Sequence, residues 1–274
     1  MSQIISSGAA EELKLVNATT IEDLNAQLLL GCTRCSRFEI RESGSFKVSP
    51  SWGNPDGKLL ICSESPSTRD AELGVPFSHG SGDKIKDMCR YVGLNPEQDV
   101  FWTNLVQCPA LHDAEPTKSE TDACSKYLKQ VIRLSSFKAI WVFGNTAFTA
   151  LTGRELKNEA GSDHSFPLVD AYITACDDNR LIKSGQSSMA SITQDDREGH
   201  KIGSNSIPVW GFYHTAALFK HSIHTEKIKR TMLTTLEAFK KHQGREKPWA
   251  DLGLQTTYRG LAWPTRLSKI EDLL

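Results

Sequence analysis

Residues 57–62 read Gly-Lys-Leu-Leu-Ile-Cys, a short apolar run of the kind that forms a strand buried on both faces. Similar apolar runs, rich in β-branched and aromatic residues, occur at residues 99–106, 138–143 and 207–213. Segments with apolar residues at helical spacing accompany these runs, at residues 83–92, 118–134 and 145–152. This alternation predicts the α/β class, as a three-layer α/β/α sandwich around a mostly parallel, four-stranded central sheet.

An N-terminal arm, residues 1–30, precedes this pattern and is expected to contain a helix that begins at Thr20 or Asp23. The apolar face of that helix is expected to consist of Leu24, Leu28 and Leu29.

The main domain is expected to span residues 31–243 and to end in an amphipathic helix at residues 223–243. A polar insertion, rich in Gly, Ser, Asp and Asn, occupies residues 154–206 and has one candidate strand at residues 171–175. Structureless insertions of this length are usually functional or disordered. Residues 244–274 are expected to form a C-terminal tail.

The composition is that of an ordinary globular protein. Of its 274 residues, 39% are hydrophobic and 24% are charged, and the formal net charge is −1. A DNA site on such a chain must be a local basic patch, because the whole surface is not basic. No run approaches the ~20 apolar residues that span a bilayer, and the first ten residues lack a signal-peptide pattern. We therefore expect a cytoplasmic protein without a membrane partner.

The chain contains seven cysteines, which in a cytoplasmic protein favour metal binding or core packing over disulfides. Cys32 and Cys35 form a C-x-x-C pair, Cys108 follows the second predicted strand, and Cys124 lies on the next helix. Four such thiolates suit either tetrahedral zinc or a cubane iron–sulfur cluster. The remaining cysteines fit core packing better, namely Cys62, Cys89 and Cys176.

Candidate functional residues follow the predicted strands: Glu64, Asn104, Gly144 and His214 each lie at or near a strand end. In a parallel sheet the carboxyl ends of the strands meet at one edge, where ligands bind. We therefore expect these residues to lie together.

Several longer motifs occur in a fixed order. They read Ser63-Glu-Ser-Pro-Ser67 with Asp70 and Gly74-Val-Pro-Phe77, Thr103-Asn-Leu-Val-Gln-Cys108, Pro116-x-x-x-Glu120-x-x-x-Cys124, Val142-Phe-Gly-Asn-Thr-Ala147 and His214-Thr-Ala-Ala-Leu218. In this order and spacing the chain resembles the family 4 type of uracil-DNA glycosylases, the iron–sulfur branch of that superfamily, over roughly residues 30–222.

The resemblance implies a [4Fe–4S] cluster held by Cys32, Cys35, Cys108 and Cys124, which fall in register with the family's cysteines. It implies a DNA glycosylase that flips a nucleotide into a pocket and hydrolyses its N-glycosidic bond, and we expect a monomer. The expected substrate-binding residues are Ser65, Phe77, which would stack on the base, and Asn104, whose amide would read the base edge.

The expected catalytic residues are Glu64, Asp70 and His214. A carboxylate can stabilise an oxocarbenium-like sugar or orient water, and Glu64 and Asp70 are not ranked for that role. His214 suits the donor that stabilises the departing base.

Some residues depart from the family pattern, and these departures leave open which base is the substrate. Serines stand at positions 63, 65 and 67 where the family has glycine or alanine, and Ala71, His79 and Thr215 also differ from the family residues. The base can therefore be uracil or another modified base, in repair or in defence against phage. The alternatives are a catalytically inactive [4Fe–4S] DNA-binding protein of the same fold and a zinc-binding structural protein.

Overall fold

The computed structural model describes residues 18–44, 46–110, 114–152, 169–174, 206–219 and 225–242. Its centre is a six-stranded sheet with the order β1-β3-β2-β4-β6-β5. The strands are β1 (Trp52–Gly53), β2 (Leu59–Ser63), β3 (Val100–Asn104), β4 (Ala139–Phe143), β5 (Val169–Thr174) and β6 (Ser206–Phe212).

The predicted four-stranded parallel sheet is confirmed as the middle of this larger sheet. Strands β3, β2, β4 and β6 pair in parallel, and they are the four strands expected from the sequence. Two edge strands extend the sheet, β1 antiparallel to β3 and β5 antiparallel to β6. The expected number of four strands was therefore too low. Two-residue β1 is too short to carry a pattern, and β5 corresponds to the candidate strand in the insertion.

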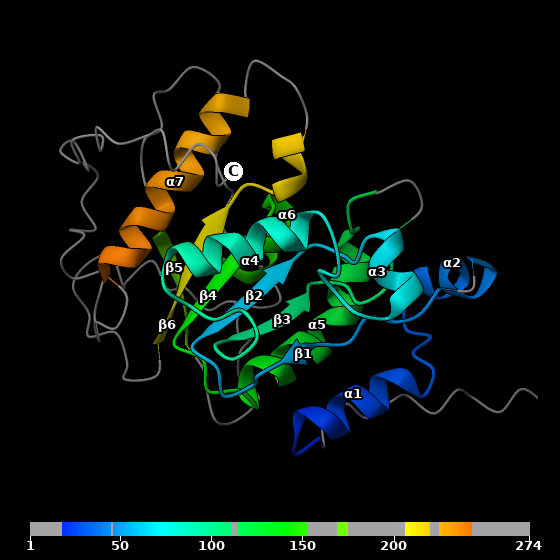
Figure 1. The fold of residues 1–274 in the computed structure, drawn as a ribbon. Coiled ribbons are helices and arrows are strands. Elements are labelled where there is room, and N and C mark those ends of the chain that lie inside the picture. The colour runs from blue at the N-terminus through cyan, green and yellow to red at the C-terminus, as the bar shows by residue number, and fades with distance from the viewer. Residues whose placement is uncertain are drawn as a thin grey trace, which may run out of the picture.

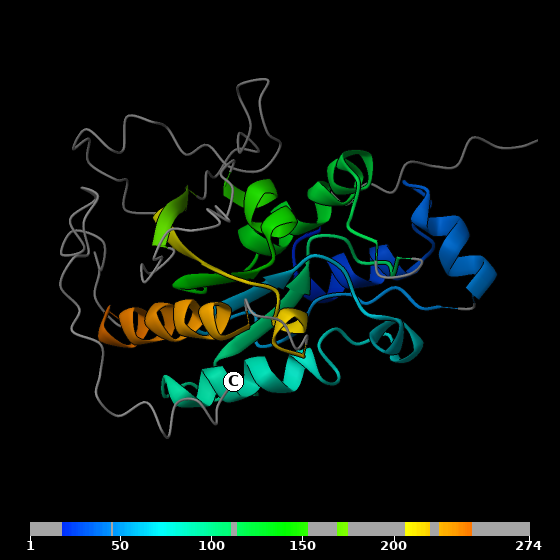
Figure 2. The ribbon, with the colours of Figure 1, turned by 90° about the horizontal axis from the view of Figure 1, so that it is seen from above.

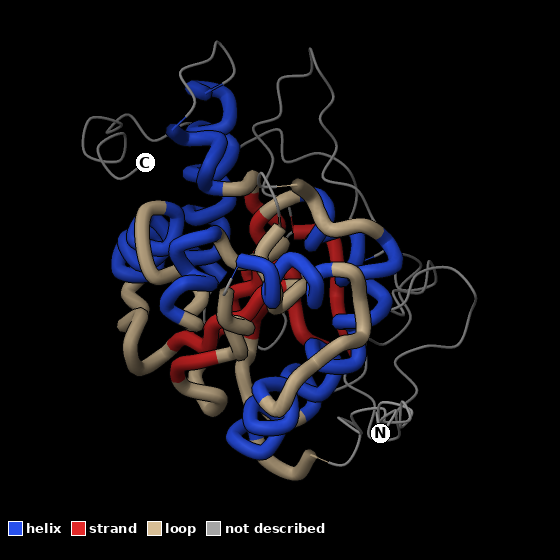
Figure 3. The backbone as a smooth tube through the Cα atoms, turned by 90° about the vertical axis from the view of Figure 1, so that its right-hand side faces the viewer, coloured by secondary structure: helices blue, strands red, loops and turns tan. Residues whose placement is uncertain are grey.

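Helices cover both faces of the sheet (Figures 1 and 2). They are α1 (Ile21–Leu29), α2 (Arg37–Gly44), α3 (Thr68–Leu73), α4 (Ser81–Tyr91), α5 (Lys118–Arg133), α6 (Asn145–Thr152), α7 (Thr225–His242) and the 3-10 helix η4 (Thr215–Phe219). In the view from above, α4 and α7 lie on one face, and α1, α5 and α6 lie on the other. The tube in Figure 3 shows the strands enclosed between these helical layers, which makes the three-layer sandwich.

The pleat of the buried strands distributes side chains between two cores. Along β2, Leu60 and Cys62 join the core under α1, α5 and α6, whereas Leu59 and Ile61 join the core under α4 and α7. Successive side chains of a strand point to opposite faces, so this alternation continues into the polar residues that follow. It decides which of them reach the same site.

Helix α1 is part of the main core. Thr20 caps it by accepting a hydrogen bond from the backbone N–H of Asp23, at 3.1 Å. Leu24 and Leu28 are buried in the core that α1 shares with α5. The inclusion of Leu29 in the apolar face was wrong, because its side chain is 56% exposed.

Helices α2 and α3 were not expected from the sequence. The buried side chains of α2 are Arg37 and Arg41, so apolar periodicity cannot reveal it. Helix α3 has only six residues.

No helix in the described ranges is long and apolar enough to cross a membrane. The predicted tail, most of the predicted arm and most of the insertion lie outside the described residues.

Candidate functional site

A cavity of about 420 Å³ opens at the carboxyl ends of the parallel strands, on the side of α4 and η4. Its walls come from the ends of β2 and β3, the loop before α4, the end of β6 and η4. The lining residues are Ser63, Ser65, Ser67, Asp70, Phe77, His79, Gly80, Ser81, Gly82, Asn104, His214 and Phe219. The structure thus brings together five of the six expected catalytic and substrate-binding residues; Glu64 does not line this cavity.

Phe77 lies in a strained turn at the wall of the cavity. Its φ of 58° makes it the single described non-glycine residue with a positive φ. Its ring is 6% exposed and packs 5.3 Å from the ring of Trp102. The turn depends on Gly82, because a Cβ there would collide with the backbone of Phe77. Such strain persists only where packing enforces it, and it is common at ligand sites.

Asn104 presents an unsatisfied donor at the cavity. It ends β3 in register with Ser63 of β2, and its side chain is only 2% exposed. Its Nδ2 is buried and has no hydrogen-bond partner among the described residues. Leaving such a group unpaired costs on the order of 1–3 kcal/mol, so a ligand with an acceptor oxygen would recover that free energy.

His214 follows β6, and the tautomer of its ring is set by the backbone. The N–H of Ala216 donates to His214 Nδ1 at 3.2 Å. Nδ1 must therefore be an acceptor, and the neutral ring carries its proton on Nε2. A donor of this kind suits an oxygen that gains negative charge.

Asp70 borders the cavity, but its carboxylate is used within the protein. Oδ2 accepts from the backbone N–H of Ser67 at 3.1 Å and from its hydroxyl at 2.8 Å, which closes the capping box of α3. Oδ1 accepts from the backbone N–H of Ser78 at 2.7 Å and from its hydroxyl at 2.6 Å. These four bonds tie the α3 end of the loop to the Phe77 turn.

The side chain of Glu64 points away from the cavity, toward α6. Ser63 and Ser65 line the cavity, whereas Glu64 Oε1 accepts from the backbone N–H of Thr146 at 3.1 Å, at the first turn of α6. A Cβ at Gly144 would collide with the Glu64 carboxylate, so glycine permits this approach. Burial raises the pKa of Glu64, and the Thr146 N–H opposes that rise.

The four predicted cluster cysteines are close neighbours on the α5 side of the sheet. Cys32, Cys108 and Cys124 are buried and Cys35 is half-buried. Burial raises the pKa of Cys108 to about 11 and that of Cys124 to about 12, and in both cases repulsion from neighbouring thiols of the set adds to the rise. Their thiols are not arranged so that they could hold a metal ion. Within the described part of the chain, no group of three or more His, Cys, Asp or Glu side chains has such an arrangement.

Donors and cations surround these thiols. The backbone N–H of Arg37 bonds to the Cys35 thiol, and that of Gln107 to the Cys124 thiol. Arg34 Nε donates to Cys32 Sγ at 3.3 Å, and the other two guanidinium nitrogens of Arg34 are buried without a described partner. Four thiols with orphaned cationic donors beside them fit the donor set of an anionic iron–sulfur cluster.

Sequence reasoning missed part of the cavity. Ser78, which links Asp70 to the Phe77 turn, was not singled out, and neither was Phe219, which is 53% exposed beside the cavity. His79 was noted as a departure from the family glycine and, because it lies in the Phe77 loop, as a residue that could touch DNA. Its hydrogen-bond partners required the fold.

Comparison with known proteins gives the family. The sequence profile of the Uracil DNA glycosylase superfamily matches residues 50–240, well over half of the chain. The matched range contains Cys108 and Cys124 but begins after Cys32 and Cys35.

Curated relatives carry the name Type-4 uracil-DNA glycosylase. The protein from Sulfurisphaera tokodaii is 28% identical over 117 residues, which is 42% of this chain and 51% of that protein. The protein from Saccharolobus solfataricus is 31% identical over 111 residues, 40% of this chain and 49% of that protein. The protein from Pyrobaculum aerophilum is 27% identical over 125 residues, 46% of this chain and 61% of that protein. The matches therefore span about half to three-fifths of these relatives.

Proposed function

Since the chain belongs to the uracil-DNA glycosylase superfamily, we propose that it is a monofunctional DNA glycosylase. It flips a uracil or another modified base out of DNA and hydrolyses the N-glycosidic bond, which leaves an abasic site. The Type-4 uracil-DNA glycosylase name of the relatives supports uracil as the first base to test. The serines at positions 63, 65 and 67 support an altered base as the second, because all three line the cavity.

The orphaned amide of Asn104 is the observation that carries this proposal. Its Nδ2 is a buried donor without a described partner in a cavity of about 420 Å³. A carbonyl oxygen on the edge of a flipped base would satisfy it. The Phe77 ring in the same wall offers an aromatic face on which the base can stack.

The catalytic residues of the proposal have different positions. The Nε2–H of His214 would donate to the base oxygen that becomes negative as the bond breaks. The Asp70 carboxylate already accepts four hydrogen bonds, so it would act through its neighbours. Glu64 does not border the cavity, and this supports a smaller contribution from its carboxylate.

Cys32, Cys35, Cys108 and Cys124 would hold a [4Fe–4S] cluster in this proposal. The hydrolysis needs no electron transfer, so the cluster would be structural. It would tie the segment before α2 to the segment after β3, through Cys108, and to α5, through Cys124. Zinc is the competing occupant, and anaerobically purified protein distinguishes the two, because a cluster absorbs at roughly 400 nm and zinc thiolates are colourless.

The test is a glycosylase assay on DNA that contains uracil, hypoxanthine or a modified cytosine. Abasic sites are revealed by alkaline cleavage. We expect cleavage of at least one substrate by the wild-type protein and loss of cleavage in His214→Ala. The range of bases cleaved separates a repair role from a role against modified phage DNA.

A catalytically inactive DNA-binding protein is the second candidate. The observation that favours it is that both expected carboxylates, Glu64 and Asp70, are engaged by protein hydrogen bonds. Intact DNA on every substrate, with the cluster present and DNA bound, would establish this candidate and reject the enzyme.

A further inference from the structure

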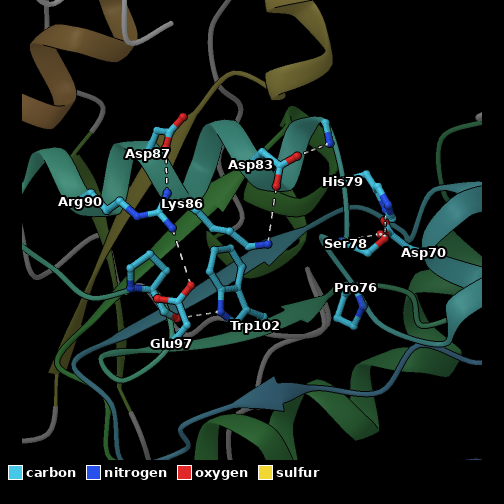
Figure 4. A network of polar contacts seen from close by, with 12 residues as sticks. Asp70, Pro76, Ser78, His79, Asp83, Lys86, Asp87, Arg90, Glu97 and Trp102 are labelled. Atoms are coloured by element: carbon cyan, nitrogen blue, oxygen red, sulfur yellow. Dashed lines mark hydrogen bonds and ion pairs between the residues drawn. The ribbon is translucent and has the colours of Figure 1, made fainter.

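A chain of hydrogen bonds runs from Asp70 through Ser78 to His79 at the wall of the cavity (Figure 4). The Ser78 hydroxyl lies 2.6 Å from Asp70 Oδ1, and His79 Nδ1 lies 2.8 Å from the Ser78 hydroxyl oxygen. Asp70 and His79 both line the cavity, and the His79 ring is exposed.

The protons of this chain can be assigned from donor and acceptor capacity. An ionised carboxylate only accepts, so the single hydroxyl hydrogen of Ser78 must point to Asp70. The Ser78 oxygen can then only accept from His79, and His79 Nδ1 must carry a proton. In the neutral ring Nε2 is therefore unprotonated and is a base.

The same reasoning gives the opposite result for His214. Its Nδ1 accepts from the backbone N–H of Ala216, so its proton lies on Nε2. Two histidines that line one cavity are thus held in opposite tautomers. One can supply a hydrogen-bond donor and the other can accept a proton.

The position of His79 suits the sugar rather than the base. Asn104, which would read the base, is 2% exposed, whereas the His79 ring is open to solvent. In a flipped nucleotide the base enters the cavity and the sugar stays nearer its mouth, where water arrives.

We propose that His79 Nε2 is the base that takes a proton from the water attacking C1′ of the flipped nucleotide; this rests on the proposed glycosylase function. The water oxygen bonds to C1′, and the C1′–N bond breaks with its electron pair moving to the base. The proton of the water passes to His79 Nε2, and the departing base later takes up one proton. The sum is hydrolysis to an abasic site and a free base.

Asp70 and Ser78 are positioning residues in this step. They fix the His79 ring through Nδ1, and the negative carboxylate stabilises the imidazolium that forms. This assigns Asp70 an indirect part, in agreement with a carboxylate whose hydrogen bonds all lie within the protein.

The experiment compares His79→Ala and Ser78→Ala with the wild-type full chain carrying its cluster. The substrate is DNA with whichever base the wild-type protein excises, under single-turnover conditions. Affinity is measured separately, on DNA with a tetrahydrofuran abasic analogue.

We expect His79→Ala to lower the cleavage rate by about 100-fold and Ser78→Ala by about tenfold. Affinity should stay within about threefold, and added imidazole should restore part of the His79→Ala rate. Ser43→Ala, an exposed serine on α2, is the matched control and should cleave at the wild-type rate.

Three results would overturn the proposal: a wild-type rate in His79→Ala, a loss of affinity as large as the loss of rate, or no restoration by imidazole. Melting temperature and cluster absorbance confirm that each variant is folded. A wild-type protein that cleaves no substrate rejects the proposed function together with this step, whereas an active wild-type protein with an equally active His79→Ala rejects this step alone.

Discussion

Selected buried polar groups on the two faces of the central sheet differ in whether they have partners within the protein. Under α5, one buried charged pair is satisfied within the protein: Arg37 and Glu120 form an ion pair at 3.1 Å with both side chains at most 8% exposed. On the side of α4, the buried donor of Asn104 has no described partner, and Phe77 has a positive φ. One face therefore has the character of a structural support and the other that of a ligand site.

This difference shows that the cavity contains groups whose conformation or lack of a partner destabilises the folded state. A strained residue and an unpaired donor each cost on the order of 1–3 kcal/mol, and here both line one cavity. On the opposite face, two buried guanidinium nitrogens of Arg34 are also without a described partner, beside the predicted cluster cysteines. Unpaired buried nitrogens therefore occur both at the proposed ligand cavity and beside the proposed cluster ligands.

The largest expected effect is on the cysteine side, from removal of one predicted ligand. Cys124→Ala should abolish absorbance at roughly 400 nm and lower the melting temperature by about 10 °C or more, because loss of a metal site exceeds ordinary mutational effects. Cys89→Ala is the matched control, since Cys89 is also a buried helical cysteine. It should keep the absorbance. Equal spectra in the two variants would remove Cys124 from the ligand set.

On the cavity side, Asn104→Ala should lower the single-turnover cleavage rate by about 100-fold, because the donor to the base edge is lost. Its melting temperature should not fall below that of the wild type by more than about 2 °C, since an unsatisfied group is removed. Asn54→Ala, at an exposed turn, should cleave normally. A large loss of stability in Asn104→Ala would mean that the amide is paired in the protein and does not await a ligand.

The strained turn gives a smaller effect. Gly82→Ala should displace Phe77, with a loss of about 1–3 kcal/mol in unfolding free energy and about tenfold in cleavage rate. Gly93→Ala is the matched glycine, because its φ is +84° but its new Cβ would meet nothing within 4 Å. It should lose about 1 kcal/mol of stability without loss of rate. A Gly82→Ala protein with the wild-type rate would show that the Phe77 turn does not matter for cleavage.

The smallest effect is expected at Glu64. Burial raises its folded-state pKa, so its contribution to stability is present below its ordinary pKa and is lost as the pH rises through the raised value. Glu64→Gln should therefore melt slightly higher than the wild type at pH 7, and the difference should vanish below about pH 4. The cleavage rate should fall by about fivefold or less. A loss as large as that of Asn104→Ala would place the Glu64 carboxylate in the reaction.

The four parallel strands were predictable because each contains a short, mostly apolar run rich in β-branched or aromatic residues. That Asn104 and His214 line one cavity was predictable, because Asn104 ends such a strand, His214 follows one, and parallel strands bring their ends together. Edge strand β1 was not, because a two-residue pairing leaves no periodicity. Helix α2 was not, because arginines form its buried side.

By itself, the sequence determined the class of fold, the order of its parallel strands along the chain and the residue types available at their ends, since these depend on local hydrophobic pattern. Only the tertiary structure decided which of those residues share a cavity. The pleat after β2 directs Ser63 and Ser65 to one side and Glu64 to the other. The tautomers of His79 and His214 were likewise decided by their hydrogen-bond partners, because the proton on an imidazole goes to the nitrogen that faces an acceptor.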